Sequence, residues 1–178
     1  MRIISGKFKG RKIRAQLKNN VTRPTMDMAK EGLFNILDHR YDLEEIKTLE
    51  LFGGTGSISL EFISRGVMDA TIVERDYKCF VYIKQLSNEF NIENELKIKK
   101  YDVIKFLESD TEKYDIIFAD PPYNYPNMEK IIDIIYNKNL LKPEGIIIFE
   151  HDNKNDFSEH PKYINSKKYG TSIFSFFQ

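Results

Sequence analysis

The stretch from Tyr114 to Tyr123, YDIIFADPPY, constrains the fold more than any other part of this chain. Residues 116–119 are apolar and rich in strand-forming types, so they predict a buried strand. The prolines at positions 121 and 122 follow at once and can continue neither a strand nor a helix. In open α/β sheets, ligands bind at the carboxyl ends of the strands. The stretch therefore places a carboxylate, two rigid carbonyls and a phenol at that edge.

These groups suit methylation of the exocyclic amine of a nucleobase. The lone pair of such a nitrogen is delocalised into the ring, and acceptors for both N–H protons favour a more tetrahedral nitrogen. Asp120 offers one acceptor, and the Pro121 carbonyl, held by the fixed geometry of Pro122, offers another. Tyr123 supplies a flat face on which an extruded base can stack. The alternative is an ordinary Pro-Pro turn after a core strand, with a solvated Asp120.

A glycine loop follows an earlier predicted strand. Residues 46–52 form this strand, which runs into Gly53-Gly54-Thr55-Gly56-Ser57 and a helix that Gly66 closes. Glycines let a ligand approach the backbone, and free N–H groups at a helix start can hold a carboxylate. The spacing is close to the dinucleotide fingerprint, so a nicotinamide dehydrogenase is an alternative. The loop lacks the Gly-Lys-Ser/Thr ending of a phosphate-cradling nucleotidase loop.

Two further carboxylates follow predicted strands. Residues 70–73 form a strand that ends at Glu74, whose distance from the glycines suits a carboxylate that accepts both ribose hydroxyls of an adenosine. Residues 96–101 form the next strand, and Asp102 follows it. Asp102 fits two roles, as acceptor for the amino group of an adenine or as cap of the helix that starts at Val103.

The rest of the chain continues the alternation of strand and helix. The periodicity predicts helices over 26–38, 77–91 and 128–136, a turn over 140–145, a buried strand over 146–149, and a final hairpin of 163–168 with 173–177. This order predicts a mostly parallel seven-stranded sheet with helices on both faces and a closing antiparallel hairpin. Gly32 interrupts the first helix, and close approach of a ligand or of neighbouring backbone would explain it.

Charge is distributed unevenly along the chain. The 178 residues carry 27 basic and 27 acidic side chains, yet residues 1–30 hold nine Lys or Arg and one acid, Asp27. Two short strands around a glycine-bounded turn, residues 2–5 and 11–14, predict a basic β-hairpin. The charge split favours a basic arm that faces the phosphates of a nucleic acid. We expect this hairpin (1–22) to be an extension of one α/β domain (23–178).

Composition limits the remaining classes. No apolar run approaches the ~20 residues of a membrane span, and no signal-peptide core is present. Cys79 is the only cysteine, which fits a reducing cytoplasm, and we expect an inert, partly buried thiol. The three histidines, at positions 39, 151 and 160, have no ligand spacing, so we predict no metal.

The ordered motifs resemble those of a known family. ELFGGTG (50–56), Glu74, Asp102 and DPPY (120–123) look like the successive motifs of S-adenosylmethionine-dependent amino-methyltransferases. RIISG (2–6), RPT (23–25), EGLFNIL (31–37) and SRG (64–66) narrow the resemblance to the bacterial family that methylates guanine N2 in the RNA of the small ribosomal subunit. The resemblance covers nearly the whole chain.

The resemblance implies a Rossmann-like class I methyltransferase fold and a role for each motif. The glycine loop would hold the methionine part of S-adenosylmethionine, with Glu74 on the ribose and Asp102 on the adenine. Asp120 and the Pro121 carbonyl would polarise the guanine amine for direct in-line transfer, leaving S-adenosylhomocysteine. Glu50 stands where the family usually has Asp. The implied residues are Asp120, Pro121, Pro122 and Tyr123 for catalysis; Glu50, Phe52, Gly53, Gly54, Thr55, Gly56, Glu74 and Asp102 for the cofactor; and Arg2, Lys7, Lys9, Arg11, Lys12 and Arg23 for RNA phosphates.

The resemblance implies that the partner is 16S ribosomal RNA, in the small subunit or one of its assembly intermediates. It also implies that the protein is a cytoplasmic monomer. Three other interpretations of the motifs are open. An adenine-N6 methylase of DNA or RNA would share the central motif. A dehydrogenase would explain the glycine loop and Glu74, but neither Asp120 nor the basic arm. A non-catalytic RNA-binding assembly factor would explain the arm alone.

Overall fold

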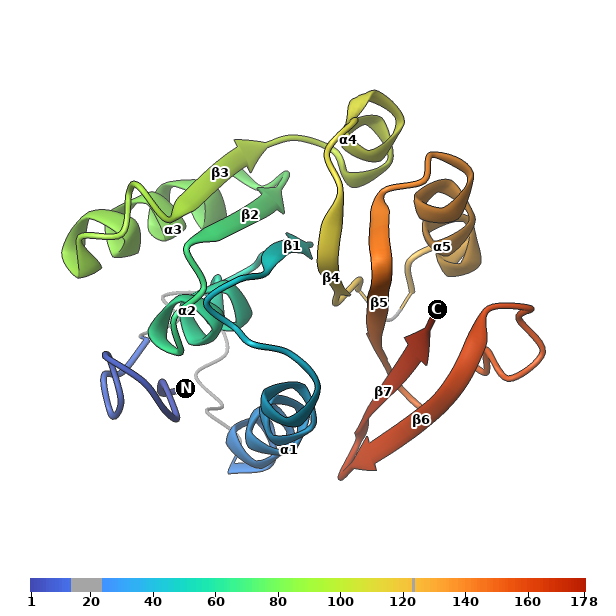
Figure 1. Cartoon of the computed structure of the whole chain (residues 1–178), viewed down its shortest axis with the longest axis horizontal. Helices are drawn as coiled ribbons and strands as arrows, with labels where there is room; N and C mark the ends of the chain where they lie inside the picture. Colours follow the sequence, from blue (N-terminus) through green and yellow to red (C-terminus); the bar gives the residue numbers. More distant parts are fainter. Residues whose placement is uncertain (14–23, 123) are drawn as a thin grey trace.

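A seven-stranded sheet forms the centre of the molecule, with strand order β3-β2-β1-β4-β5-β7-β6 (Figure 1). The computed structural model describes residues 1–13, 24–122 and 124–178. Pairing is parallel from β3 to β5 and antiparallel for β5 with β7 and β7 with β6. The strands are β1 (Lys47–Leu51), β2 (Asp69–Glu74), β3 (Leu96–Lys100), β4 (Tyr114–Ala119), β5 (Leu141–His151), β6 (Tyr163–Tyr169) and β7 (Ser172–Phe177).

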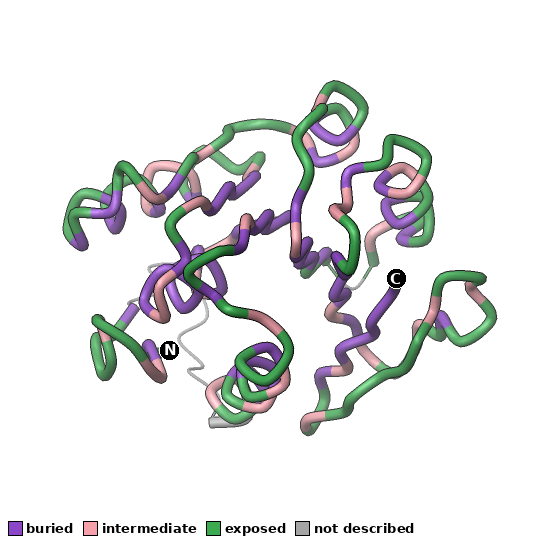
Figure 2. The backbone as a smooth tube through the Cα atoms, viewed as in Figure 1, coloured by how far each residue is buried: buried purple, intermediate pink, exposed green. Residues whose placement is uncertain are grey.

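In the described residues, five helices cover the two faces of this sheet. Side chains of α1, α2 and α3 join one buried cluster, and side chains of α4 and α5 join the other. Residues of the central strands alternate between the clusters, as period-two geometry requires. Figure 2 shows the resulting pattern, with buried residues along the inner strands and exposed residues along β6. The helices are α1 (Pro24–Arg40), α2 (Ser57–Ser64), α3 (Tyr77–Phe90), α4 (Val103–Ser109) and α5 (Met128–Asn137).

The predicted fold class is confirmed, and one local prediction is wrong. Residues 140–145 were expected to form a turn, but β5 already begins at Leu141. Tyr114 pairs with Leu141, and Ile116 pairs with Ile146, so the register shifts between the two pairs. The extra residues on β5 bulge out, and one of them, Glu144, adopts a left-handed backbone conformation with a φ of 61°. The Lys-Pro-Glu-Gly sequence is typical of a turn, but here it forms the irregular beginning of a long strand.

Gly32 lies within α1, which continues through it, and its contact differs from the two expected ones. A Cβ at this position would lie 2.3 Å from the aromatic ring of Tyr169, which is the last residue of β6. Neither a ligand nor a neighbouring backbone segment accounts for the glycine. Gly32 instead lets a tyrosine ring pack directly on the helix backbone, and this contact joins α1 to the closing hairpin.

The basic amino-terminal segment is folded onto the domain. Its antiparallel hairpin is reduced to one bridge between Arg2 and Lys12, supported by the hydrogen bond from the Ile3 N–H to the Arg11 carbonyl (3.0 Å). Ile3 and Ile13 are buried in the same cluster as α1 and α2. Arg14 lies outside the described residues, as does the stretch up to Arg23 with the expected boundary between 22 and 23. The described part of the segment contributes to the core of the domain.

A buried carboxylate anchors this segment. Glu61 of α2 has no exposed surface and accepts the backbone N–H groups of Ile4 (2.8 Å) and Ser5 (3.0 Å). It also pairs with Lys30 of α1 (3.0 Å) and Arg65 (2.9 Å). Burial lowers the pKa of Lys30, and the charge of Glu61 opposes that shift. One carboxylate therefore joins the amino-terminal segment, α1 and α2.

Replacing Glu61 should destabilise the protein strongly. Glu61→Gln leaves Lys30 buried without its counter-charge, and breaking a buried pair in this way typically costs about 3–5 kcal/mol. We expect a loss of this size in the free energy of unfolding, measured by urea denaturation. Glu89→Gln is the control, because the pair of Glu89 with Arg11 is exposed and worth at most about 1 kcal/mol. Equal stability of the two variants would contradict the anchoring role.

Candidate active site

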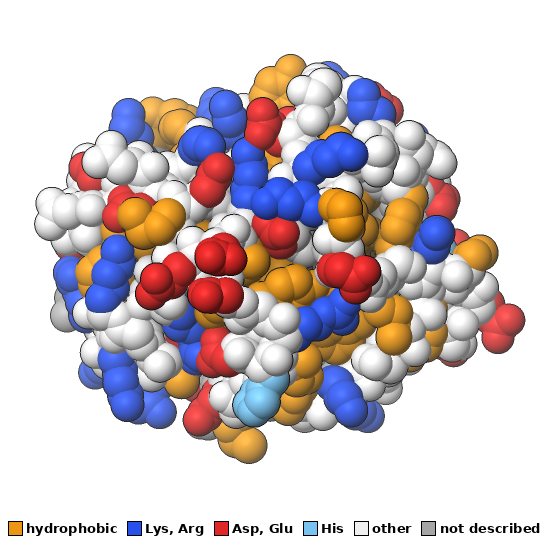
Figure 3. All heavy atoms as spheres, viewed as in Figure 1, with side chains coloured by type: hydrophobic (Ala, Val, Ile, Leu, Met, Phe, Trp, Pro, Cys, Tyr) orange, Lys and Arg blue, Asp and Glu red, His pale blue; other side chains and the backbone are white. Residues whose placement is uncertain are grey.

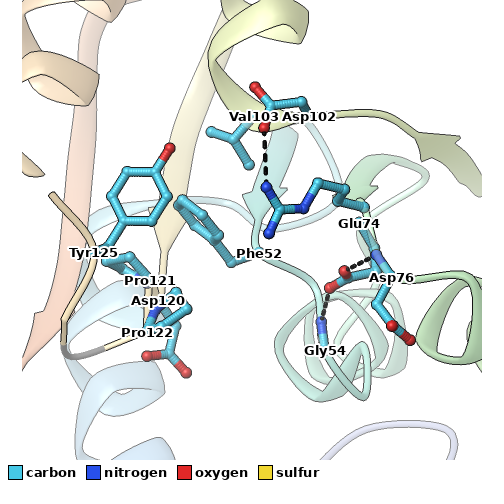
Figure 4. Close-up of a pocket in the computed structure, with 11 residues that line it drawn as sticks. Phe52, Gly54, Glu74, Asp76, Asp102, Val103, Asp120, Pro121, Pro122 and Tyr125 are labelled. Carbon is cyan, nitrogen blue, oxygen red and sulfur yellow. Dashed lines mark hydrogen bonds and ion pairs between the residues drawn. The ribbon is translucent and has the colours of Figure 1, made fainter.

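The main cleft lies at the carboxyl ends of β1, β2 and β4 and has a volume of about 500 Å³ (Figure 4). The glycine loop, the end of β2, the start of α4 and the stretch after β4 all contribute to it. Sequence reasoning placed its candidate groups at this edge of the sheet, and the structure brings them together. The cleft is lined by Phe52, Gly54, Glu74, Arg75, Asp76, Asp102, Val103, Asp120, Pro121, Pro122 and Tyr125.

Glu74 is held in place by backbone donors. The Gly54 N–H donates to one carboxylate oxygen of Glu74 (2.8 Å), and the Asp76 N–H donates to the other (2.6 Å). Figure 4 shows this carboxylate between the glycine loop and the turn after β2. A carboxylate oxygen has further lone pairs, so Glu74 keeps acceptor capacity for a ligand in the cleft. The loop and the end of β2 are thereby fixed relative to each other.

Asp102 caps α4, which was one of its two expected roles. Its carboxylate accepts the N–H groups of Ile104 (3.1 Å) and Lys105 (3.3 Å). The other carboxylate oxygen lies 3.6 Å from the exposed guanidinium of Arg75. Capping uses mainly one oxygen, so the second oxygen faces Arg75 and the cleft. The cap therefore leaves an acceptor at the end of the cleft opposite Asp120.

Two aromatic rings form the apolar wall of the cleft. Phe52 and Tyr125 pack edge to face with ring centroids 5.0 Å apart. Phe52 has a φ of 61°, in the left-handed region that costs a non-glycine residue free energy. This backbone turn directs the ring into the cleft immediately before the glycines. Tyr125 was not among the predicted site residues, and Tyr123, which was, lies outside the described residues.

A second cavity of about 230 Å³ opens on the α1 side of Asp120. We call it the acidic cavity, because Glu50, Asp120 and Glu150 all line it, with Lys30 as the basic side chain among its described lining residues. Gly53 and Thr55 of the glycine loop also contribute. Phe52, Gly54 and Asp120 line both spaces. Asp120 therefore stands between the main cleft and the acidic cavity.

Glu50 is used to cap the helix after the glycine loop. The Ser59 N–H (2.8 Å) and the Ser59 hydroxyl (2.5 Å) both donate to the same oxygen of Glu50, and the Ile58 N–H also donates to this carboxylate. The start of α2 was expected to offer free N–H groups to a ligand, but Glu50 takes up two of them. Burial raises the pKa of Glu50 to about 7 despite these donors.

Asp120 and Glu150 form a pair of neighbouring carboxyls. The Asp120 side chain opens into both cavities and is exposed. Burial, followed by the charges of Glu150 and Glu50, raises the pKa of Asp120 well above its ordinary value. Burial raises the pKa of Glu150 as well, against a hydrogen bond with Ser172. Water in the open cavities weakens these effects, and a ligand that displaces this water would strengthen them.

Most of the predicted site residues meet around these two spaces. Gly56 directly precedes α2 and has a φ of 72°, as a tight glycine turn requires. Gly53 is needed for packing, because a Cβ there would lie 2.5 Å from the Ile72 side chain. Sequence reasoning missed Glu150, although it directly follows a predicted strand. The rule that selected Glu74 and Asp120, a carboxylate immediately after a buried strand, would also have found it.

The basic segment is partly neutralised within the fold. Arg2 pairs with Asp27 (3.3 Å), Lys7 with Glu95 (3.6 Å) and Arg11 with Glu89 (3.0 Å). Lys9 and Lys12 are exposed, and Arg23 lies outside the described residues. On the face drawn in Figure 3, acidic and basic side chains are interspersed. Exposed pairs of this kind are weak, so phosphates can compete for these cations.

Other candidate groups have simple structural roles. Cys79 is buried, as expected, and burial raises the pKa of its thiol to about 11. Within residues 1–13, 24–122 and 124–178, no three His, Cys, Asp or Glu side chains gather closely enough to hold a metal ion. In this described part of the chain, every helix is too short or too polar to cross a bilayer.

The raised pKa of Glu50 predicts a pH-dependent stability difference. The unfolded chain releases this proton near 4.5 and the folded protein near 7, so stability falls as pH rises between these values. Keeping Glu50 ionised in the fold costs about 3 kcal/mol at about 1.4 kcal/mol per pKa unit. Glu50→Gln should therefore raise Tm relative to the native protein by roughly 5–10 °C more at pH 8 than at pH 4.5. The exposed Glu93→Gln should show no such difference, and a Glu50→Gln curve parallel to it would refute the assignment.

Comparison with known proteins shows the family to which this chain belongs. The family model described as "Conserved hypothetical protein 95" matches residues 1–178. The Ribosomal RNA small subunit methyltransferase D of Buchnera aphidicola is 36% identical over 153 residues, which cover 85% of this chain and 78% of that protein. The Escherichia coli protein yhhF has a similar structure, with a TM-score of 0.84, 25% identity and coverage of 100% and 97% of the two chains.

A more distant structure, SMU.776, was solved in complex with S-adenosylhomocysteine. Its TM-score is 0.67 at 16% identity, over 86% of this chain and 49% of that one, so it supports the fold alone. The expected resemblance to small-subunit ribosomal RNA methyltransferases is confirmed at the level of the family. The chain therefore belongs to the Conserved hypothetical protein 95 family and has the Rossmann-like fold of the S-adenosylmethionine-dependent methyltransferases.

Proposed function

We propose that this protein transfers a methyl group from S-adenosylmethionine to the N2 amine of one guanine in the RNA of the small ribosomal subunit. The observation that carries the proposal is the position of Asp120. It follows β4 directly, precedes the rigid Pro121-Pro122, and lies between the main cleft and the acidic cavity. An acceptor at this point can contact a base on one side while a methyl donor occupies the other.

The main cleft fits the adenosine part of the cofactor. Glu74 and Asp102 each keep acceptor capacity, one for ribose hydroxyls and one for the adenine amine. Phe52 and Tyr125 give an apolar wall against which an adenine ring can pack. The glycine loop leaves room beside the backbone between these groups and Asp120. When bound, S-adenosylmethionine supplies an electrophilic methyl group attached to a sulfonium.

Asp120 and the Pro121 carbonyl would act on the base. Each accepts one N–H of the guanine amine, which fixes the nitrogen and favours a lone pair directed toward the cleft. Methylation leaves this nitrogen with one proton too many, and Asp120 is the acceptor beside it. Tyr123 would stack on the extruded base. Fixing two reactants in this geometry can lower the barrier by ~7–11 kcal/mol, and polarisation by the carboxylate adds to that.

The RNA substrate is supported by the relatives and by the amino-terminal segment. The Buchnera aphidicola protein is a ribosomal RNA small subunit methyltransferase by name. Met1 and Lys30 line the acidic cavity, so the basic segment lies next to the proposed base site. Arg2, Lys7, Lys9, Arg11, Lys12 and Arg23 would bind phosphates. The enzyme would act as a cytoplasmic monomer on 16S ribosomal RNA within the subunit or an assembly intermediate.

The identity of the methylated nucleoside tests this function. The protein is incubated with radiolabelled S-adenosylmethionine and small subunits from cells that lack the gene, and the RNA is then digested to nucleosides. We expect label in N2-methylguanosine at a single position. N6-methyladenosine would instead support the adenine-methylase alternative, which shares Asp120 and the prolines. Cofactor binding with no labelled RNA would refute the proposed substrate.

Substitution of Asp120 separates catalysis from cofactor binding. Asp120→Ala should keep the affinity for S-adenosylmethionine within a few-fold, measured by calorimetry, yet reduce methyl transfer by at least about 100-fold. Asp120→Asn should retain part of the activity, because its amide oxygen still accepts a hydrogen bond. Glu108→Ala, on the exposed side of α4, is the control and should behave like the native protein. Full activity of Asp120→Ala would eliminate the proposed role.

A further inference from the structure

Glu150 is a partly buried carboxylate that has no role in the proposed mechanism. It lies near the carboxyl end of β5, lines the acidic cavity, and has a hydrogen bond with Ser172. A carboxylate in such a position loses water of hydration. This loss costs free energy unless hydrogen-bond donors of the protein or of a ligand replace the water. Glu50 has such donors at Ser59 and Glu74 has them at Gly54 and Asp76. The hydrogen bond with Ser172 leaves further lone pairs on Glu150, so a carboxylate that lines the cavity keeps acceptor capacity there.

The strand register places Glu150 beside Asp120. Ala119 of β4 pairs with Phe149 of β5 in parallel, so the following residues, Asp120 and Glu150, lie next to each other. Ala119 and Phe149 belong to the cluster under α4 and α5. By the alternation of strand side chains, Asp120 and Glu150 both point to the opposite, α1-covered face. Figure 4 shows the Asp120 carboxylate directed away from Glu74 and Asp102, in agreement with this alternation.

No cation among the described lining residues neutralises this pair directly. Lys30 is committed to Glu61 (3.0 Å) and to the Arg2 carbonyl (2.6 Å). Repulsion between the neighbouring carboxyls favours a partner that brings hydrogen-bond donors to both. The Watson–Crick edge of guanine carries adjacent donors, N1–H and the N2 amine. Adenine has an unprotonated N1 beside its amine, and that lone pair would face a carboxylate.

We propose that Glu150 accepts the N1–H of the target guanine while Asp120 accepts an N–H of its N2 amine, so that Glu150 selects guanine. This inference rests on the proposed function and names the group that sets its base specificity. Glu150 orients the base by its edge, and the amine is left in front of the cleft. An analogue that keeps the amine but lacks N1–H leaves Glu150 unpaired and is rejected for that reason.

The test compares guanine with 2-aminopurine at the target position of a small-subunit RNA. 2-Aminopurine keeps the 2-amine, but its N1 carries a lone pair in place of the proton. We expect the native protein to prefer guanine by at least about 100-fold in kcat/KM. Glu150→Gln can donate its amide N–H to that lone pair, so the preference should narrow by at least tenfold. Glu150→Ala should narrow it as well, through loss of activity on guanine.

The control is Glu144→Gln, a change of the same type at an exposed site on β5 far from the cavity. It should leave the preference unchanged. The preference is a ratio measured within one preparation, so a partly unfolded variant still gives a valid value. If both Glu150 variants keep the native preference for guanine over 2-aminopurine, and the native protein methylates guanine N2, the inference is overturned and the proposed function is not. Absence of N2-methylguanosine with the native protein would instead refute the proposed function itself.

Discussion

The contacts of Glu61 are the interaction on which the arrangement of the site depends. This carboxylate has no exposed surface and is saturated by donors from the amino-terminal segment, α1 and α2. Ionisation in such a place is tolerated because every lone pair is directed at a donor. Its position on α2, the helix after the glycine loop, brings Met1 and Lys30 to the edge of the acidic cavity. The segment with the densest positive charge is thus fixed beside Asp120.

The carboxylates of the site are held very differently from Glu61. Glu50 remains buried with a raised pKa despite its donors, and the neighbouring charge of Glu150 disfavours ionisation of Asp120. Phe52 adds a left-handed backbone conformation at the same place. These features destabilise the folded state locally. They persist because the surrounding parallel strands hold the backbone in place. A ligand that supplies donors to Asp120 and Glu150 would relieve part of this cost, and this relief is the basis that we propose for selective binding at this point.

The fold was largely predictable because its signals are local. Short runs of strand-forming residues before Gly53, Glu74, Asp102 and Asp120 predict where each strand ends, and a parallel sheet gathers those ends at one edge. The missed features depend on contacts between distant residues. Gly32 faces the ring of Tyr169, and the Lys-Pro-Glu-Gly stretch enters β5 only because β4 pairs beyond it. Tyr125 meets Phe52 through a loop whose path no periodicity encodes. Glu150 did have a local signal, because it directly follows a predicted buried strand. Its position beside Asp120 could be predicted only if β4 and β5 were known to be neighbours.

The charge split along the sequence also changes meaning in the folded protein. Nine basic residues near the amino terminus suggest a strongly positive arm, yet Arg2, Lys7 and Arg11 already face acidic partners on the domain. Such exposed pairs are worth little and are weakened by salt. RNA phosphates would replace these acidic partners of the cations at small cost in free energy. Affinity for RNA and selection of the base would then depend on different residues, the cations on the outside and the paired carboxylates within.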